Sequence, residues 1–157
     1  MLPALGSLAA AQSKATETTA KAYTKLLNYA ATHLDAVVRY NKSGMILQIH
    51  SDTSYLSETE ARSRASGFFY LGDNTDESSP EASPPTLNGA IHINSSMTNN
   101  VMVSTTEAEV GALFHNAQDG GTFRQCLLFL GHPQPAIPTQ TDNACAEGII
   151  NDTVKQK

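Results

Sequence analysis

Hydrophobic and polar residues alternate along residues 45–54, MILQIHSDTS, in the pattern that is typical of a β-strand. With a period of two, Met45, Leu47 and Ile49 share one face, and Asp52 lies on the opposite face near the end of the run. The pattern therefore predicts a strand that presents a carboxylate where it ends. Asp-Thr-Ser is also typical of a turn, so Asp52 has a purely structural alternative.

A helical pattern precedes this strand. Apolar residues recur every three or four positions from Ala15 to Leu34, which predicts a helix with a solvated polar face. Pro3 and Gly6 interrupt residues 1–12, which are therefore predicted to be loosely structured.

Two more strands are predicted after residue 54. Residues 64–72 are rich in aromatic residues and predict a strand, and residues 90–94 predict a shorter one after the turn signal Asn88-Gly89. Between them, residues 73–85 hold acidic residues, prolines and serines, which is typical of a solvated loop. Because local connections join the three strands, we expect an antiparallel meander.

A capping box predicts where the next helix begins. In Ser104-Thr105-Thr106-Glu107, Ser104 is expected at the N-cap, and Glu107 is expected to reach back to the cap amide. Glu109 flanks the apolar stripe of this helix and has no capping role, and a Glu beside a buried stripe is costly unless it is paired or binds a metal ion. A surface Glu that extends into solvent is the structural alternative. The stripe is predicted to consist of Val110, Leu113, Phe114 and Ala117.

The C-terminal part is predicted to place one strand between two helices. Asp142 follows this strand, and either Asp142 or Asn143 could cap the last helix. The predicted elements are, in order, a short helix at 122–130 that begins after Gly120-Gly121 and ends at Gly131, a strand near 137–141, and a helix at 144–150.

Composition narrows the classes of function. The 157 residues carry a net charge of −5, which disfavours a broad basic surface for nucleic acid. This net charge is still compatible with a nucleic-acid enzyme in which metal ions bridge carboxylates and phosphates. The two cysteines, Cys126 and Cys145, form neither a metal-binding spacing nor a disulfide framework, so we expect an intracellular protein, cytoplasmic or nuclear and not secreted. Residues 1–12 lack the basic region of a signal peptide and are too short to be a membrane anchor.

Three carboxylates stand at the ends or starts of predicted elements, where they could share one space: Asp52, Glu109 and Asp142. Converging carboxylates repel one another and have raised pKa values unless cations hold them. Hard divalent ions with oxygen ligands resolve this repulsion, and two ions roughly 4 Å apart are the arrangement that supports in-line attack on phosphodiesters.

The motifs around these acids resemble one family. HSDTSYLSETEARSRASGFFYLG, NGAIHINSS, STTEAEVGALFHNA and PTQTDNACAEGIIND are similar to the ribonuclease H domain of retrotransposon polyproteins, especially the Ty1/copia type. The resemblance covers residues 44–157. Residues 1–43 are similar to the helical segment that connects the reverse transcriptase to this domain.

The resemblance implies an α/β fold of the ribonuclease H type, a mixed sheet of three antiparallel strands and a parallel strand flanked by helices. It implies that Asp52, Glu109 and Asp142 are the catalytic residues and the ligands of two Mg²⁺ ions, with Mn²⁺ as an alternative. The implied activity is cleavage of the RNA strand of RNA–DNA hybrids, read by backbone shape and 2′-OH groups, with the reverse transcriptase domain as partner and no membrane. The family continues with a fourth carboxylate and a last strand or helix, so the domain is expected to be incomplete at its C-terminus.

Two other functions fit the sequence. A ribonuclease H-like fragment with little or no activity would act as a binding module for nucleic acid or protein. A thiol enzyme that uses Cys145 and His115 is disfavoured, because neither residue lies in a recognisable nucleophile setting.

Overall fold

The computed structural model describes residues 1–73 and 87–153, and the predicted loop at 73–85 therefore lies almost entirely outside the described residues. The chain forms two compact units, Met1–Val38 and Arg39–Lys157. Residues 39–43 group with the second unit. Within the described residues, no helix combines the length and the apolar character that crossing a bilayer requires.

The first unit consists of helices only. They are α1 (Leu2–Ala11), the 3₁₀ turn η1 (Gln12–Lys14) and α2 (Glu17–Thr32), and none of them contains a buried residue. The prediction of loose structure for residues 1–12 is wrong. Pro3 lies in the first turn of α1, where the missing N–H group would have no intrahelical partner in any case, so proline starts this helix instead of breaking it. The helix predicted at 15–34 is confirmed as α2.

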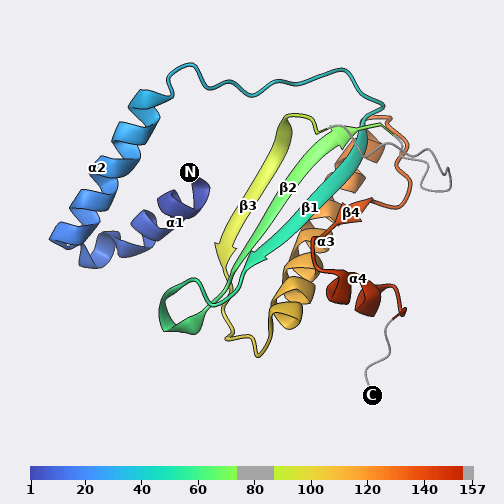
Figure 1. Cartoon of the computed structure of the whole chain (residues 1–157). Helices are drawn as coiled ribbons and strands as arrows, with labels where there is room; N and C mark the ends of the chain where they lie inside the picture. Colours follow the sequence, from blue (N-terminus) through green and yellow to red (C-terminus); the bar gives the residue numbers. More distant parts are fainter. Residues whose placement is uncertain (74–86, 154–157) are drawn as a thin grey trace. The chain divides into compact units, whose positions relative to one another are not determined.

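A four-stranded mixed sheet forms the centre of the second unit (Figure 1). The sheet order is β3-β2-β1-β4, with β1 antiparallel to β2, β2 antiparallel to β3, and β4 parallel to β1. The predicted meander is thus confirmed. The strands are β1 (Ile46–Ser54), β2 (Arg64–Gly72), β3 (Ala90–Met97) and β4 (Thr139–Gln140). The third strand is longer than the predicted 90–94, because Ser95, Ser96 and Met97 continue the ladder with β2.

The long helix α3 (Thr105–Phe129) lies along one face of this sheet (Figure 1). The core between them consists of Leu47 and Ile49 from β1, Phe69 from β2 and Leu127 from α3. Leu47 and Ile49 alternate along β1 as the sequence pattern predicts, and both are fully buried.

Two predictions for α3 are wrong. The helix runs through Gly120-Gly121 without a break, so residues 122–130 are not a separate element. A Cβ atom at Gly120 would lie 2.6 Å from Ile49 Cδ1, so glycine is present here because the helix approaches β1 closely. In the predicted apolar stripe, Phe114 and Ala117 are exposed, whereas the buried face carries Ala108, Glu109, Ala112, Leu113, Asn116, Gly120 and Leu127.

After α3, the chain returns to the edge of β1. Gly131 has φ of +86°, and the amides of Gly131 and His132 donate to the carbonyls of Leu128 and Leu127, which is a Schellman motif. The Gln134 side chain then accepts a hydrogen bond from the Leu47 amide at 3.0 Å and donates one to the Met45 carbonyl at 2.7 Å.

The parallel strand β4 continues this attachment to β1. Ile49 pairs with Thr139, and the Ile49 amide donates to the Pro138 carbonyl at 3.0 Å. Pro138 itself precedes β4, where its missing N–H group disturbs no ladder bond. Helix α4 (Ala144–Ile150) follows, as predicted.

Candidate acidic site at the end of the central strand

The start of α3 assigns a structural role to one glutamate and leaves its neighbour without one. Ser104 is the N-cap and its hydroxyl accepts a hydrogen bond from the Glu107 amide at 3.1 Å. The Glu107 carboxylate accepts from the Val103 amide at 2.7 Å, one residue before the predicted cap amide. Glu107 is exposed and serves the helix terminus, whereas Glu109 points toward the sheet and is only 6% exposed.

The start of α4 divides its two polar residues in the same way. Asn143 is the N-cap, and its side-chain oxygen accepts from the amides of Cys145 and Ala146, each at 3.0 Å. The sequence left open whether Asp142 or Asn143 caps the helix, and the structure selects Asn143. Asp142 is exposed and is left without a capping role.

Asp52 lies within β1, because the strand continues to Ser54. The turn alternative for Asp52 is therefore wrong. Its Oδ1 atom accepts a hydrogen bond from the Thr53 amide at 2.8 Å. The Thr53 hydroxyl, on the other face of the strand, donates to the Ala108 carbonyl of α3 at 3.3 Å and so connects the strand to the helix beside Glu109.

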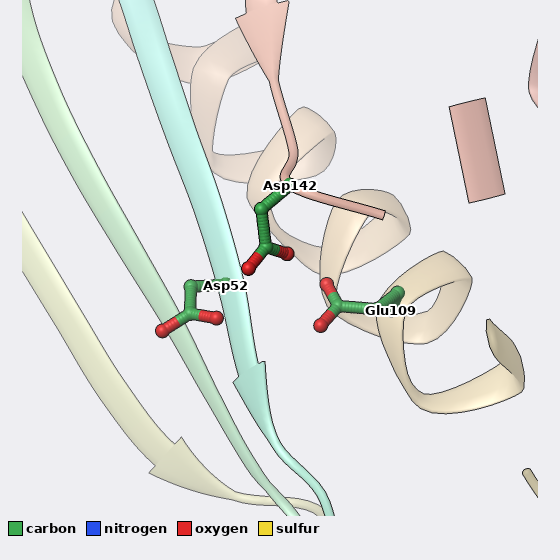
Figure 2. A group of neighbouring side chains, drawn as sticks. All are labelled: Asp52, Glu109 and Asp142. Atoms are coloured by element: carbon green, nitrogen blue, oxygen red, sulfur yellow. The ribbon is translucent and has the colours of Figure 1, made fainter. Parts of the chain in front are cut away.

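The three carboxylates that the sequence singled out lie together (Figure 2). One oxygen atom from each of Asp52, Glu109 and Asp142 lies within 4.8 Å of the other two. They come from β1, from the first turns of α3 and from the segment between β4 and α4. Residues far apart in the sequence are thus brought to one point at the end of the central strand, where α3 and β4 flank it.

Burial and the neighbouring negative charges both raise the pKa of Glu109. Burial raises the pKa of the Glu109 carboxyl, and the negative charges of Asp142 and Asp52 raise it further. Hydrogen bonds from the Thr53 amide and from the Thr141 hydroxyl, which lies 3.5 Å from Glu109 Oε2, lower this pKa in part. The cluster therefore concentrates negative charge that its own hydrogen bonds do not offset.

A buried asparagine that the sequence analysis missed supports the site. Asn116 of α3 donates to Ser51 Oγ of β1 and to the Ser66 carbonyl of β2, both at 2.9 Å. A Cβ atom at Gly67 would lie 2.4 Å from Asn116 Oδ1, so β2 needs glycine at the residue that faces this amide. Asn116 lies two turns after Glu109, which is a spacing that could have placed it on the same buried face.

The donor set suits a hard divalent cation. Three carboxylates provide only oxygen ligands, as Mg²⁺ and Mn²⁺ prefer, and Asp52 and Asp142 are exposed, so an ion can enter from solvent. A cation here would also relieve the repulsion that raises the pKa of Glu109. The residues present thus fit such an ion.

Other candidate groups do not form a comparable site. Cys145 and His115 are both exposed, and among the described residues the acidic cluster is the one group of three or more side chains arranged to hold a metal ion.

Comparison of the chain with models of protein families, with curated proteins and with solved structures gives no match. The function of the cluster must therefore be inferred from its motifs and its geometry.

Proposed function

We propose that this chain is a ribonuclease H-like domain that cleaves the RNA strand of RNA–DNA hybrids with two divalent metal ions. The observation that carries the proposal is the convergence of Asp52, Glu109 and Asp142, whose oxygen atoms lie within 4.8 Å of one another. The order of the motifs along the chain and the mixed sheet with β4 parallel to β1 support it.

The three acids would bind the metal ions, and two neighbouring threonines would position one of the acids. Asp52, Glu109 and Asp142 would hold two Mg²⁺ ions, which when bound would activate the attacking water and stabilise the leaving oxygen of the phosphodiester. Glu109 must be ionised to take part, so its raised pKa makes ion binding weaken as the pH is lowered. Thr53 and Thr141 would act as positioning residues, because their polar groups hydrogen-bond the Glu109 carboxylate or its helix.

Cleavage of a labelled RNA–DNA hybrid tests the proposal. The wild-type chain should cut the RNA strand when Mg²⁺ is present and should leave the DNA strand intact. Asp52→Asn should lower the rate at least about 100-fold, since it removes a charge that holds the ions. Glu107→Gln is the matched control, because Glu107 lies on the same helix as Glu109 but caps it. If the folded wild-type chain cuts nothing with Mg²⁺ or Mn²⁺, the enzymatic proposal is wrong.

A second candidate is a non-catalytic binding module, and the charge distribution favours it. Three of the arginines in the second unit are engaged within the chain: Arg62 pairs with Glu60, Arg64 pairs with Glu58, and Arg124 donates to two backbone carbonyls. In the part of this unit that the structure describes, few basic groups thus remain for phosphates, which are the main source of nucleic-acid affinity. The charge distribution thus favours a protein over a nucleic acid as the partner, and this candidate predicts protein binding that is unaffected by Asp52→Asn and by removal of divalent ions.

A further inference from the structure

The segment that leads from the first unit toward β1, residues 39–43, is held on the sheet by the side chain of Asn88. Asn88 Oδ1 accepts a hydrogen bond from the Asn41 amide at 2.7 Å, and Asn88 Nδ2 donates to the Asn41 carbonyl at 2.9 Å. Nδ2 also donates to the Leu71 carbonyl of β2 at 2.8 Å, and Oδ1 accepts from the Gly89 amide at 2.9 Å. All four hydrogen-bonding positions of this side-chain amide are therefore occupied, and its orientation is fixed.

Two further contacts bring residues 39–43 close to the turn at Asn88-Gly89. The Tyr40 hydroxyl donates to the Ala90 carbonyl at 2.9 Å. A Cβ atom at Gly89 would lie 2.7 Å from the Arg39 carbonyl oxygen and equally close to the Tyr40 ring, so glycine is what lets the two backbones approach here. The Asn88 side chain is thus the centre of a clasp, which consists of residues 39–41, Leu71 and residues 88–90.

Asparagine followed by glycine is also the dipeptide in which the side-chain amide is hydrolysed most easily, because glycine has no side chain that hinders its own nitrogen. The Gly89 nitrogen attacks Asn88 Cγ and forms a bond to it. The Cγ–Nδ2 bond breaks, and Nδ2 leaves as ammonia with the proton of the Gly89 nitrogen. Water then opens the resulting five-membered imide at either carbonyl, which leaves aspartate or isoaspartate at position 88. Water is the only other reactant.

We propose that Asn88 is a deamidation site that the clasp protects, and that its reaction irreversibly releases residues 39–43 from the sheet. In the closed clasp, the Gly89 N–H group points at Asn88 Oδ1 and both hydrogens of Nδ2 are engaged, so the Gly89 nitrogen lies beside Cγ but is not oriented to attack it. Transient opening of the clasp removes these restraints. The reaction replaces the Nδ2 donor with an acceptor oxygen that faces the carbonyl oxygens of Asn41 and Leu71, so the clasp cannot close again.

Cleavage by trypsin measures the release, since Arg39 and Lys42 both lie in residues 39–43. Asn88→Asp mimics one product of the reaction. It should raise the rate of cleavage after Arg39 and Lys42 at least about tenfold, because two carbonyls lose their donor and face a charge. Asn99→Asp is the matched control: it adds the same charge at an exposed residue after β3 and should leave the rate unchanged. Cleavage of the Asn88→Asp chain that is as slow as in the wild type would overturn the proposal.

Mass spectrometry after incubation under mildly alkaline conditions measures the deamidation itself, and fragmentation of the peptides assigns it to Asn88. The folded wild-type chain should react at least about tenfold more slowly than the chain unfolded in urea. Tyr40→Phe should speed the reaction of the folded chain about two- to tenfold, since it removes one hydrogen bond of the clasp but keeps the ring against Gly89. Tyr23→Phe alters an exposed tyrosine of α2 and is the control, which should have no effect.

Circular dichroism must show that the Asn88→Asp chain is folded. If it is not, Tyr40→Phe takes its place in the trypsin assay, where cleavage after Arg39 and Lys42 should rise about two- to tenfold. Equal rates of deamidation in the folded and unfolded chains, or no reaction at Asn88 in either, would overturn the proposal. A Tyr40→Phe chain that reacts no faster than the wild type would also overturn it. None of these tests depends on the hydrolase activity.

Discussion

The two halves of α3 contact the same sheet in different ways. The C-terminal half contributes large apolar side chains: Leu127 belongs to the core with Leu47, Ile49 and Phe69, and Phe123 packs against it. The buried face of the N-terminal half carries mostly small or polar residues, with Leu113 as its one large apolar side chain; these residues are Ala108, Glu109, Ala112, Leu113 and Asn116.

The difference shows how one helix can both stabilise the fold and present a carboxylate. Apolar burial in the C-terminal half contributes free energy of folding. Small side chains in the N-terminal half let the backbone approach β1, so Glu109 reaches Asp52 at the cost of burying a charge. The two halves should therefore respond in opposite ways to substitution.

The largest expected effect is on stability in the C-terminal half. Leu127→Ala should lower the free energy of unfolding by about 2–5 kcal/mol, because it removes a buried side chain and leaves a cavity. Chemical denaturation measures this loss. Leu128→Ala is the neighbouring control: Leu128 is 37% exposed, and its replacement should cost clearly less. Similar losses for both variants would show that the core does not depend on this half of the helix.

Asn116 marks the boundary between the halves and should show an intermediate effect. Asn116→Ala should lower the free energy of unfolding by about 1–3 kcal/mol, since the Ser66 carbonyl and the Ser51 hydroxyl lose a buried donor. Equilibrium unfolding provides the value. A loss near zero would mean that these hydrogen bonds do not hold α3 on the sheet.

In the N-terminal half, removal of a charge should stabilise the fold. The pKa of Glu109 is higher in the folded state than in the unfolded state. Above about pH 4.5 the folded state therefore retains more protons than the unfolded state does, and the free energy of unfolding falls with rising pH until the raised pKa is passed. Glu109→Gln should abolish this fall and be more stable than the wild type at neutral pH, with the difference vanishing below the unfolded pKa. Thermal unfolding as a function of pH, without divalent ions, measures it. A variant that is less stable at neutral pH would contradict the burial of an unfavourable charge.

The smallest effect is expected at the helix cap. Ser104→Ala should lower the free energy of unfolding by about 1 kcal/mol, because the Glu107 amide loses its acceptor. Ion binding at the acidic cluster should not change, since Ser104 caps the helix and is not one of the three acids. A loss of ion affinity equal to that of Glu109→Gln would mean that the cap and the site are one structural unit.

Sequence patterns predicted where the helices and strands lie better than they predicted which side of each is buried. The meander, the start of α3 and the whole of α4 follow from period-two alternation and capping residues, which act locally. The continuous path of α3 through Gly120-Gly121 could not be predicted in this way, because it depends on close approach to Ile49, a contact between distant parts of the chain.

The site could be predicted only in part, because local signals identify its acids but not the polar residue that lies behind them. Capping chemistry separated Glu107 from Glu109 before any contact was known, and the motif order named Asp52 and Asp142. Asn116 was missed because a polar residue gives no periodic apolar signal. Only the structure shows that it faces Ser51 and the Ser66 carbonyl across the sheet.

Binding of Mn²⁺, followed by electron paramagnetic resonance, tests most directly whether the three carboxylates form a metal site. The wild-type chain should bind Mn²⁺ at the cluster, and Mg²⁺ should compete for it. Glu109→Gln should lower the affinity at least about 10-fold, whereas Glu107→Gln, two residues away, should leave it unchanged. Equal Mn²⁺ binding by the wild type and both variants would contradict the assignment of Asp52, Glu109 and Asp142 as a metal site.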